Sequence, residues 1–114
     1  MHKTEKVLKI YHTPQGGSPF VEWHERLRDG KARAVISVRI ARIRVGNLGD
    51  CKPVGHGVME LRIHYGPGYR VYFGQDGNTI VVLLLGGDKD SQRTNIAKAR
   101  SYWEEYRRHC HESG

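Results

Sequence analysis

The 114-residue chain is long enough to bury a core but too short for two ordinary domains, so we expect one domain over residues 1–114. Its 19 Lys and Arg residues against 12 Asp and Glu residues give a formal charge of +7, which favours a polyanionic partner such as nucleic acid. The sequence lacks the roughly 20 successive apolar residues of a membrane span, the apolar core of a signal peptide and any CxxC pair. We therefore expect a cytoplasmic protein with reduced thiols.

The N-terminal part predicts a strand followed by a short helix. Residues 5–13, EKVLKIYHT, alternate loosely between polar and apolar and run into a Thr-Pro-Gln-Gly-Gly turn, as a strand does. In residues 18–30, SPFVEWHERLRDG, Ser18 is placed as an N-cap and Pro19 as the first helical residue. This amphipathic helix is expected to end at the Asp-Gly pair that closes the segment.

Residues 31–47, KARAVISVRIARIRVGN, carry signals for both a strand and a helix. They are rich in β-branched residues, and part of the segment alternates as a strand would. However, the segment is longer than the usual ~3 to 10 residues of a strand. Ile36, Ile40 and Ile43 also keep helical spacing, so the segment predicts a second helix that ends at Gly46.

The C-terminal half predicts three antiparallel strands and a last helix. Residues 48–57 indicate a loop, residues 60–73 a hairpin, and residues 79–85 an apolar strand that is buried either on both faces of the sheet or in an interface with a partner. Residues 91–109 place apolar side chains at helical spacing, with Ile96, Ala99, Trp103 and Tyr106 as the seam. The expected fold is α+β, with a small antiparallel-rich sheet, two N-terminal helices and a C-terminal helix.

The hairpin ELRIHYGPGYRVYF raises the question of a phosphate site. If Gly-Pro-Gly is a three-residue loop, His64 pairs with Arg70 and Arg62 with Tyr72. Together with Glu60, these side chains would share one face, opposite the apolar Leu61, Ile63, Val71 and Phe73. Arginine forks match phosphate oxygens. A merely solvated sheet face is the alternative, because polar alternation is common in antiparallel sheets.

Two other motifs are weaker candidates for a functional site. His109-Cys110-His111 could be imagined as metal ligands, but we interpret it as a frayed C-terminal tail and expect no metal site. Gly86-Gly87 lacks the spacing of a phosphate loop, and we interpret it as a strand end that places Lys89 near the edge of the sheet.

Three segments resemble the RelE/ParE toxin superfamily, and specifically the HigB-like addiction module killer proteins related to phage-derived toxins. They are VGNLGDCKPVGHGVMELRIHYGPGYRVYF, NTIVVLLLGGDKDSQ and NIAKA, and the resemblance covers most of the chain. It implies a toxin of a type II toxin–antitoxin system that acts as an mRNA interferase on the ribosome. Such toxins cut RNA without a metal ion or other cofactor, and a cognate antitoxin, encoded next to them as a helix-turn-helix protein, silences them.

The resemblance also implies roles for individual residues. Arg70 matches the arginine of the family's GYR segment, and Arg62 and Lys89 match basic positions on either side of it. A lysine of the best-known pattern is Glu60 here, and its late tyrosine aligns near Asn95. Glu60 and His64 then become the local candidates for proton transfer. The remaining residues expected to bind RNA are Tyr72, Arg39, Arg42 and Lys52.

Two rival functions share the expected fold. A ParE-like protein would inhibit DNA gyrase without cutting RNA, and a non-catalytic domain would only bind RNA. The set of Arg62, Arg70 and Lys89 favours the nuclease, because cations at a phosphate stabilise the charge that develops during cleavage.

Overall fold

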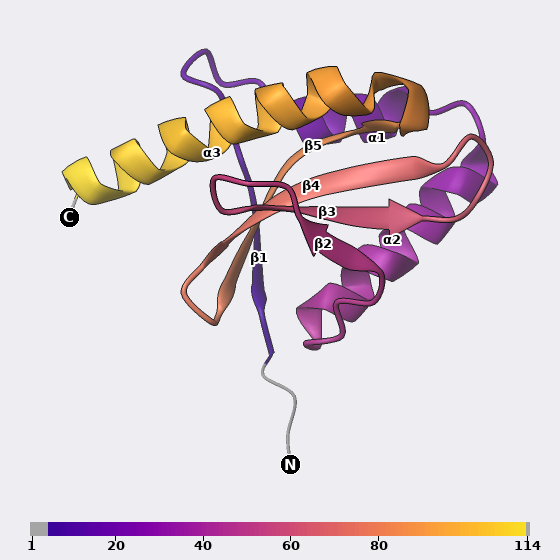
Figure 1. The fold of residues 1–114 in the computed structure, drawn as a ribbon, viewed down its shortest axis with the longest axis horizontal. Helices are drawn as coiled ribbons and strands as arrows, with labels where there is room; N and C mark the ends of the chain where they lie inside the picture. The colour runs from indigo at the N-terminus through magenta and orange to yellow at the C-terminus, as the bar shows by residue number, and fades with distance from the viewer. Residues whose placement is uncertain (1–4, 114) are drawn as a thin grey trace.

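The computed structural model describes residues 5–113, with side chains for residues 5–109. The α+β fold expected from the sequence is confirmed: five strands form one mixed sheet in the order β1-β5-β4-β3-β2, and three α-helices cover it (Figure 1). The strand β1 is parallel to β5, whereas all other neighbouring strands are antiparallel. In chain order the elements are β1 (Val7–Ile10), α1 (Pro19–Arg26), α2 (Gly30–Arg44), β2 (Cys51–Pro53), β3 (Val58–Ile63), β4 (Tyr69–Asp76), β5 (Ile80–Asp88), the short 3₁₀ helix η1 (Lys89–Ser91) and α3 (Gln92–Ser113).

The two N-terminal helices begin and end at the residues that cap them. Ser18 Oγ accepts a hydrogen bond from the Val21 amide at 3.3 Å, as predicted for the N-cap of α1. Asp29 does not end α1 but caps α2, since its carboxylate accepts the Lys31 amide at 3.0 Å. At the end of α2, Gly46 has a φ of +88° and makes the 5→2 hydrogen bond of a Schellman motif. The helical interpretation of this β-branched segment is confirmed.

Helices cover part of each face of the sheet, so the interior strand β5 has packed side chains on both sides. In Figure 1, α3 crosses in front of the sheet, and α1 and α2 lie behind it. Nearly all of β5 is buried, as its unbroken apolar run predicted. The core between the sheet and the helices α1 and α2 is built mainly from Phe20, Ile36, Ile43, Leu61, Ile63, Val71, Phe73, Val81 and Leu83. The core under α3 includes Val58, Tyr72, Val82, Leu84, Ala99 and Trp103.

The hairpin between β3 and β4 has a different register from the expected one. Arg62 pairs with Arg70 and Glu60 with Tyr72, so the loop spans residues 64–68 instead of three residues. The chain turns earlier because the Tyr65 amide donates to the Ile63 carbonyl at 2.9 Å. A shift of two residues preserves the face of every side chain, since strand side chains alternate with a period of two. The apolar face was therefore predicted correctly, while the cross-strand partners were wrong.

Three further details differ from the expectations. The segment interpreted as a loop at residues 48–57 contains β2, a strand of three residues that is too short to show an alternation. The expected first strand at residues 5–13 is shorter, because only Val7–Ile10 pair with β5. The tail prediction was also wrong, since α3 continues to Ser113; the side chains of Cys110 and His111 lie outside the described residues. Among the helices of the described part, none combines the length and the apolar character that a bilayer crossing demands.

We expect Gly86→Ala to destabilise the fold by about 1–3 kcal/mol or more, as overpacking a core does. Gly86 is buried in β5, and a Cβ there would overlap the ring of Trp23 in α1. Gly30→Ala is the matched control, because a Cβ at this first residue of α2 meets its nearest neighbouring atom, in Arg33, at 3.5 Å. Denaturant unfolding of both variants measures the difference, and equal stabilities would refute the close packing of α1 on β5.

Candidate functional site

Most of the polar side chains predicted for the site lie in two neighbouring rows across the sheet. In one row Lys52 on β2 is opposite Glu60 on β3, and Glu60 is opposite Tyr72 on β4. In the next row Arg62 is opposite Arg70. Cross-strand partners share a face, so all five side chains lie on the face that α3 partly covers. Glu60, Arg62, Arg70 and Tyr72, joined by Gln92 of α3, are called the Glu60 cluster below.

The carboxylate of Glu60 is fully buried and is the centre of this cluster. Its Oε2 accepts hydrogen bonds from Tyr72 Oη at 3.1 Å and Gln92 Nε2 at 2.8 Å, and its Oε1 accepts one from Arg62 Nε at 3.3 Å. Burial by itself raises the pKa of Glu60, but these three hydrogen bonds and the charge of Arg70 outweigh it and hold the pKa below its ordinary value. The group is thus ionised at neutral pH, which suits an anchor for arginines better than a proton carrier.

The guanidinium groups of Arg62 and Arg70 lie side by side, and the negative charge of Glu60 lies next to both. Like charges directly opposite on neighbouring strands repel, and the Nε atoms of both arginines lie within 3.8 Å of Glu60 Oε1. Arg70 also donates through Nη1 to the Gly68 carbonyl at 3.1 Å. Its Nε is the buried side-chain atom that lacks a hydrogen-bond partner within residues 5–109. The pair is therefore held in place with part of its hydrogen-bonding capacity unused.

Arg70 is largely covered, and its surroundings differ from the predicted ones. Its side chain is 12% exposed, compared with 31% for Arg62, and it has a buried acidic neighbour. Because the register differs by two residues from the expected one, Arg70 pairs with Arg62, which lies beside Glu60, and not with His64. The predicted cross-strand partner of Arg70 was therefore wrong, and Arg62 is the more accessible of the two arginines.

Tyr72 was expected to contact RNA, but its ring is fully buried against α3. Its hydroxyl donates to Glu60, and burial followed by the charge of Glu60 raises the pKa of the phenol. The ring therefore offers no surface on which a base could stack. It instead supports the carboxylate that holds the arginines.

His64 lies outside the cluster, in the loop that follows β3. Its Nε2 is 2.5 Å from Oδ2 of Asp50, and its side chain is 73% exposed. The hydrogen bond with His64 is the main cause that lowers the pKa of Asp50, despite some burial. This pair is tied to the cluster through the backbone, because the Arg62 amide donates to the Asp50 carbonyl at 2.9 Å. Arg39 of α2 also joins here, donating through Nη1 to the Arg62 carbonyl at 3.1 Å.

Lys89 and Arg42 occupy different surroundings. Lys89 is exposed at the start of η1, and its Cβ lies 3.6 Å from where a Cβ on Gly68 would stand, beside the loop that holds Arg70. Arg42 lies on the outer side of α2 next to Arg39, as expected, but away from the Glu60 cluster. Over the described residues, His, Cys, Asp and Glu side chains do not gather in threes that could hold a metal ion.

Gln92 and Asp50 were not predicted from the sequence as part of the site. Gln92 lies one helical step before Ile96 on the predicted seam of α3, so extending the seam backwards reaches it. A polar residue on such a buried seam indicates a polar partner in the core, and that partner is Glu60. Asp50 gave no comparable signal, since it lies in a glycine-rich loop before a strand too short to recognise.

The chain is a small α+β protein with one mixed sheet. Two arginines on this sheet contact a buried carboxylate near the protein surface and form a candidate anion-binding site. Residues 29–101 match the family described as Phage derived protein Gp49-like (DUF891), and the chain belongs to this family. The matched region includes every residue of the Glu60 cluster and leaves out β1 and α1.

A curated relative extends this comparison. The chain is 44% identical over 81 residues to a protein of Haemophilus influenzae described as "Uncharacterized protein", which covers 71% of this chain and 82% of the relative. No solved structure matches the chain significantly.

Proposed function

We propose that the chain is the toxin of a type II toxin–antitoxin system and cuts mRNA as a metal-independent endoribonuclease on the ribosome. The Gp49-like family is associated with RelE/HigB-type toxins, which supports the toxin class. The observation that carries the nuclease is the pair Arg62 and Arg70, held side by side on the ionised Glu60. Two guanidinium groups beside one accessible surface are what a phosphate in the course of transfer needs.

The proposed reaction is an internal attack within the RNA. The 2′-hydroxyl loses its proton to a base and attacks the adjacent phosphorus, the bond from phosphorus to the 5′-oxygen breaks, and that oxygen takes up a proton. The products are a 2′,3′-cyclic phosphate and a 5′-hydroxyl. Negative charge grows on the phosphate oxygens during the attack, and Arg62 and Arg70 stabilise it more strongly in the transition state than in the substrate.

Proton transfer in this reaction is assigned to His64 rather than to Glu60. An imidazole can both accept and donate a proton, and that of His64 is exposed beside Asp50, which holds its Nε2. Glu60 has no exposed surface from which it could reach a substrate. Lys89 adds a further cation at the Gly68 loop, where it contributes to binding of the phosphate.

The partners follow from charge and from the toxin class. The formal charge of +7 favours association with ribosomal and messenger RNA. The antitoxin is proposed to be a helix-turn-helix protein encoded beside this chain. It is expected to keep the toxin inactive by binding it.

Primer extension on cellular mRNA after brief expression tests this function. We expect new 5′ ends within translated regions a short time after induction, and none when the neighbouring antitoxin is expressed together with the toxin. Growth arrest without new RNA ends, but with loss of DNA supercoiling, would contradict the nuclease and favour a ParE-like inhibitor of DNA gyrase.

A further inference from the structure

Three arginines of α3 form a line along one side of the helix. Arg93, Arg100 and Arg107 follow one another at intervals of two helical turns, so their side chains leave the helix in nearly the same direction. The line is about 21 Å long at a rise of about 1.5 Å per residue. The seam that packs on the sheet uses other positions of the helix.

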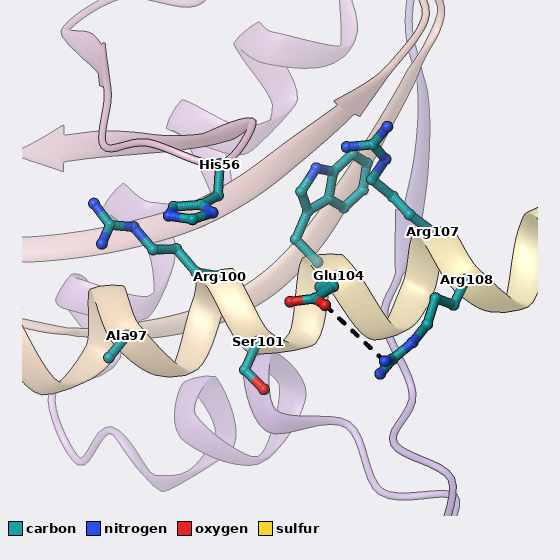
Figure 2. A pocket seen from close by; sticks show the side chains of 8 residues that line it. His56, Ala97, Arg100, Ser101, Glu104, Arg107 and Arg108 are labelled. Carbon is teal, nitrogen blue, oxygen red and sulfur yellow. Dashed lines mark ion pairs between the residues drawn. The ribbon is translucent and has the colours of Figure 1, made fainter.

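Adjoining hollows on the surface accompany this line of arginines. There are three of these hollows along α3, and neighbouring hollows share lining residues. The first lies beside Arg93 and Arg100, the second beside Arg100 and Arg107, and the third beside Arg107. The middle hollow measures about 790 Å³ and lies between α3 and the turn that joins β2 to β3. Figure 2 shows Arg100 and Arg107 on the same edge of α3 as His56, whereas Ser101 and Arg108, which also line this hollow, point toward the opposite edge. We call these hollows the α3 groove.

The α3 groove starts at the proposed site of cleavage. Gln92, whose side chain donates to Glu60, also lines the first hollow beside Arg93. A chain that lies in the groove would therefore pass from Arg107 to Arg93 and reach the Glu60 cluster. Gln92 therefore belongs to both the groove and the Glu60 cluster.

The arginines at the two ends of the groove are free to bind a ligand. Arg93 and Arg107 are exposed and make no hydrogen bond or ion pair with the part of the chain that the structure describes. Arg100 is held through Nε and Nη2 by the Val54 carbonyl, which fixes its guanidinium at the middle of the groove. Two carboxylates also line the hollows: Glu104, which pairs with Arg108 at 4.0 Å, and Asp76 in the third hollow.

We propose that the α3 groove binds the sugar–phosphate backbone of single-stranded RNA and leads it to the Glu60 cluster; this inference rests on the proposed function. A row of fixed and free guanidiniums fits a ligand with a charge on every repeating unit. We expect the RNA to be single-stranded, because the 2′-hydroxyl can align for attack on the adjacent phosphorus only where the nucleotide is not held in a double helix. An acidic protein fits less well, because the exposed large apolar residues of the described chain, Val7, Val38 and Val45, all lie away from α3.

The test is the salt dependence of binding to a fluorescently labelled single-stranded RNA. Each phosphate contact that is lost makes the slope of log K against log salt shallower by about 0.7 for a single strand. We expect Arg93→Ala and Arg107→Ala to reduce the slope by about 0.7 each, and the double variant by about 1.4. Arg26→Ala, in α1 on the opposite face of the sheet, removes the same charge from an exposed position and should keep the wild-type slope.

Each outcome of this test decides the inference. A double variant with the wild-type slope overturns it, as does an equal loss in Arg26→Ala, which would mean that only the total charge matters. It is also overturned if the wild type does not bind the RNA, or if the groove variants lose the antitoxin and keep RNA. The proposed function is judged separately: new mRNA ends with an unchanged slope refute the groove alone, while a shallower slope without new ends refutes the nuclease alone.

Discussion

Replacing Arg70 with alanine should lower the rate of RNA cleavage by about a hundredfold or more, as loss of one transition-state donor commonly does. The reason is geometric: Arg70 is held by Glu60 and by the Gly68 carbonyl, so its guanidinium is already oriented before a phosphate arrives. Cleavage of one defined mRNA by the purified variant measures the effect.

Arg70→Lys is the control that separates chemistry from folding. Lysine keeps a positive charge near Glu60 but lacks the planar fork that meets two phosphate oxygens at once. We expect this variant to melt near the wild-type temperature and still to lose most of its cleavage activity. A folded Arg70→Ala variant with full activity would remove Arg70 from the site.

Glu60→Gln should destabilise the protein by about 2–4 kcal/mol. Removing one partner of a buried ion pair typically costs about 3–5 kcal/mol, and partial exposure of Arg62 reduces this figure. The variant leaves Arg62 and Arg70 opposite each other without a carboxylate between them. Glu104→Gln is the matched control, since this exposed carboxylate meets Arg108 at 4.0 Å and its loss should cost under about 1 kcal/mol.

The stabilisation by Glu60 should also depend on pH in one direction. Its pKa is lowered in the folded protein, so the stabilisation is complete above the unfolded value of about 4.3 and is lost as pH falls through the folded value. The stability difference between wild type and Glu60→Gln should therefore shrink at acid pH. A difference that stays constant from neutral pH to below about pH 4 would contradict an ionised Glu60.

Local signals predicted most of the elements and the membership of each sheet face. Ser18 capped α1 as expected, the isoleucines of α2 kept helical spacing, and the apolar run of β5 indicated burial on both faces. The polar side of the hairpin was also predicted, because a strand's alternation survives any register shift by an even number of residues. These features depend on neighbours in the sequence.

The contacts within the site could not be predicted because they depend on residues far apart in the chain. Glu60 and Gln92 are separated by 32 positions, and their hydrogen bond forms only when α3 packs on the polar face of the hairpin. That packing converts Tyr72 from an expected RNA contact into a buried support. The five-residue loop likewise places His64 beside Asp50, and not opposite Arg70 as expected.

The chemical ends of RNA cut by the purified protein on ribosomes, with a chelator present, decide whether the protein is a metal-independent endoribonuclease. We expect a 5′-hydroxyl on one fragment and a 2′,3′-cyclic phosphate on the other, formed at a rate that the chelator does not change and that Arg70→Ala lowers by about a hundredfold or more. Fragments with a 5′-phosphate and a 3′-hydroxyl, or intact mRNA, would contradict it.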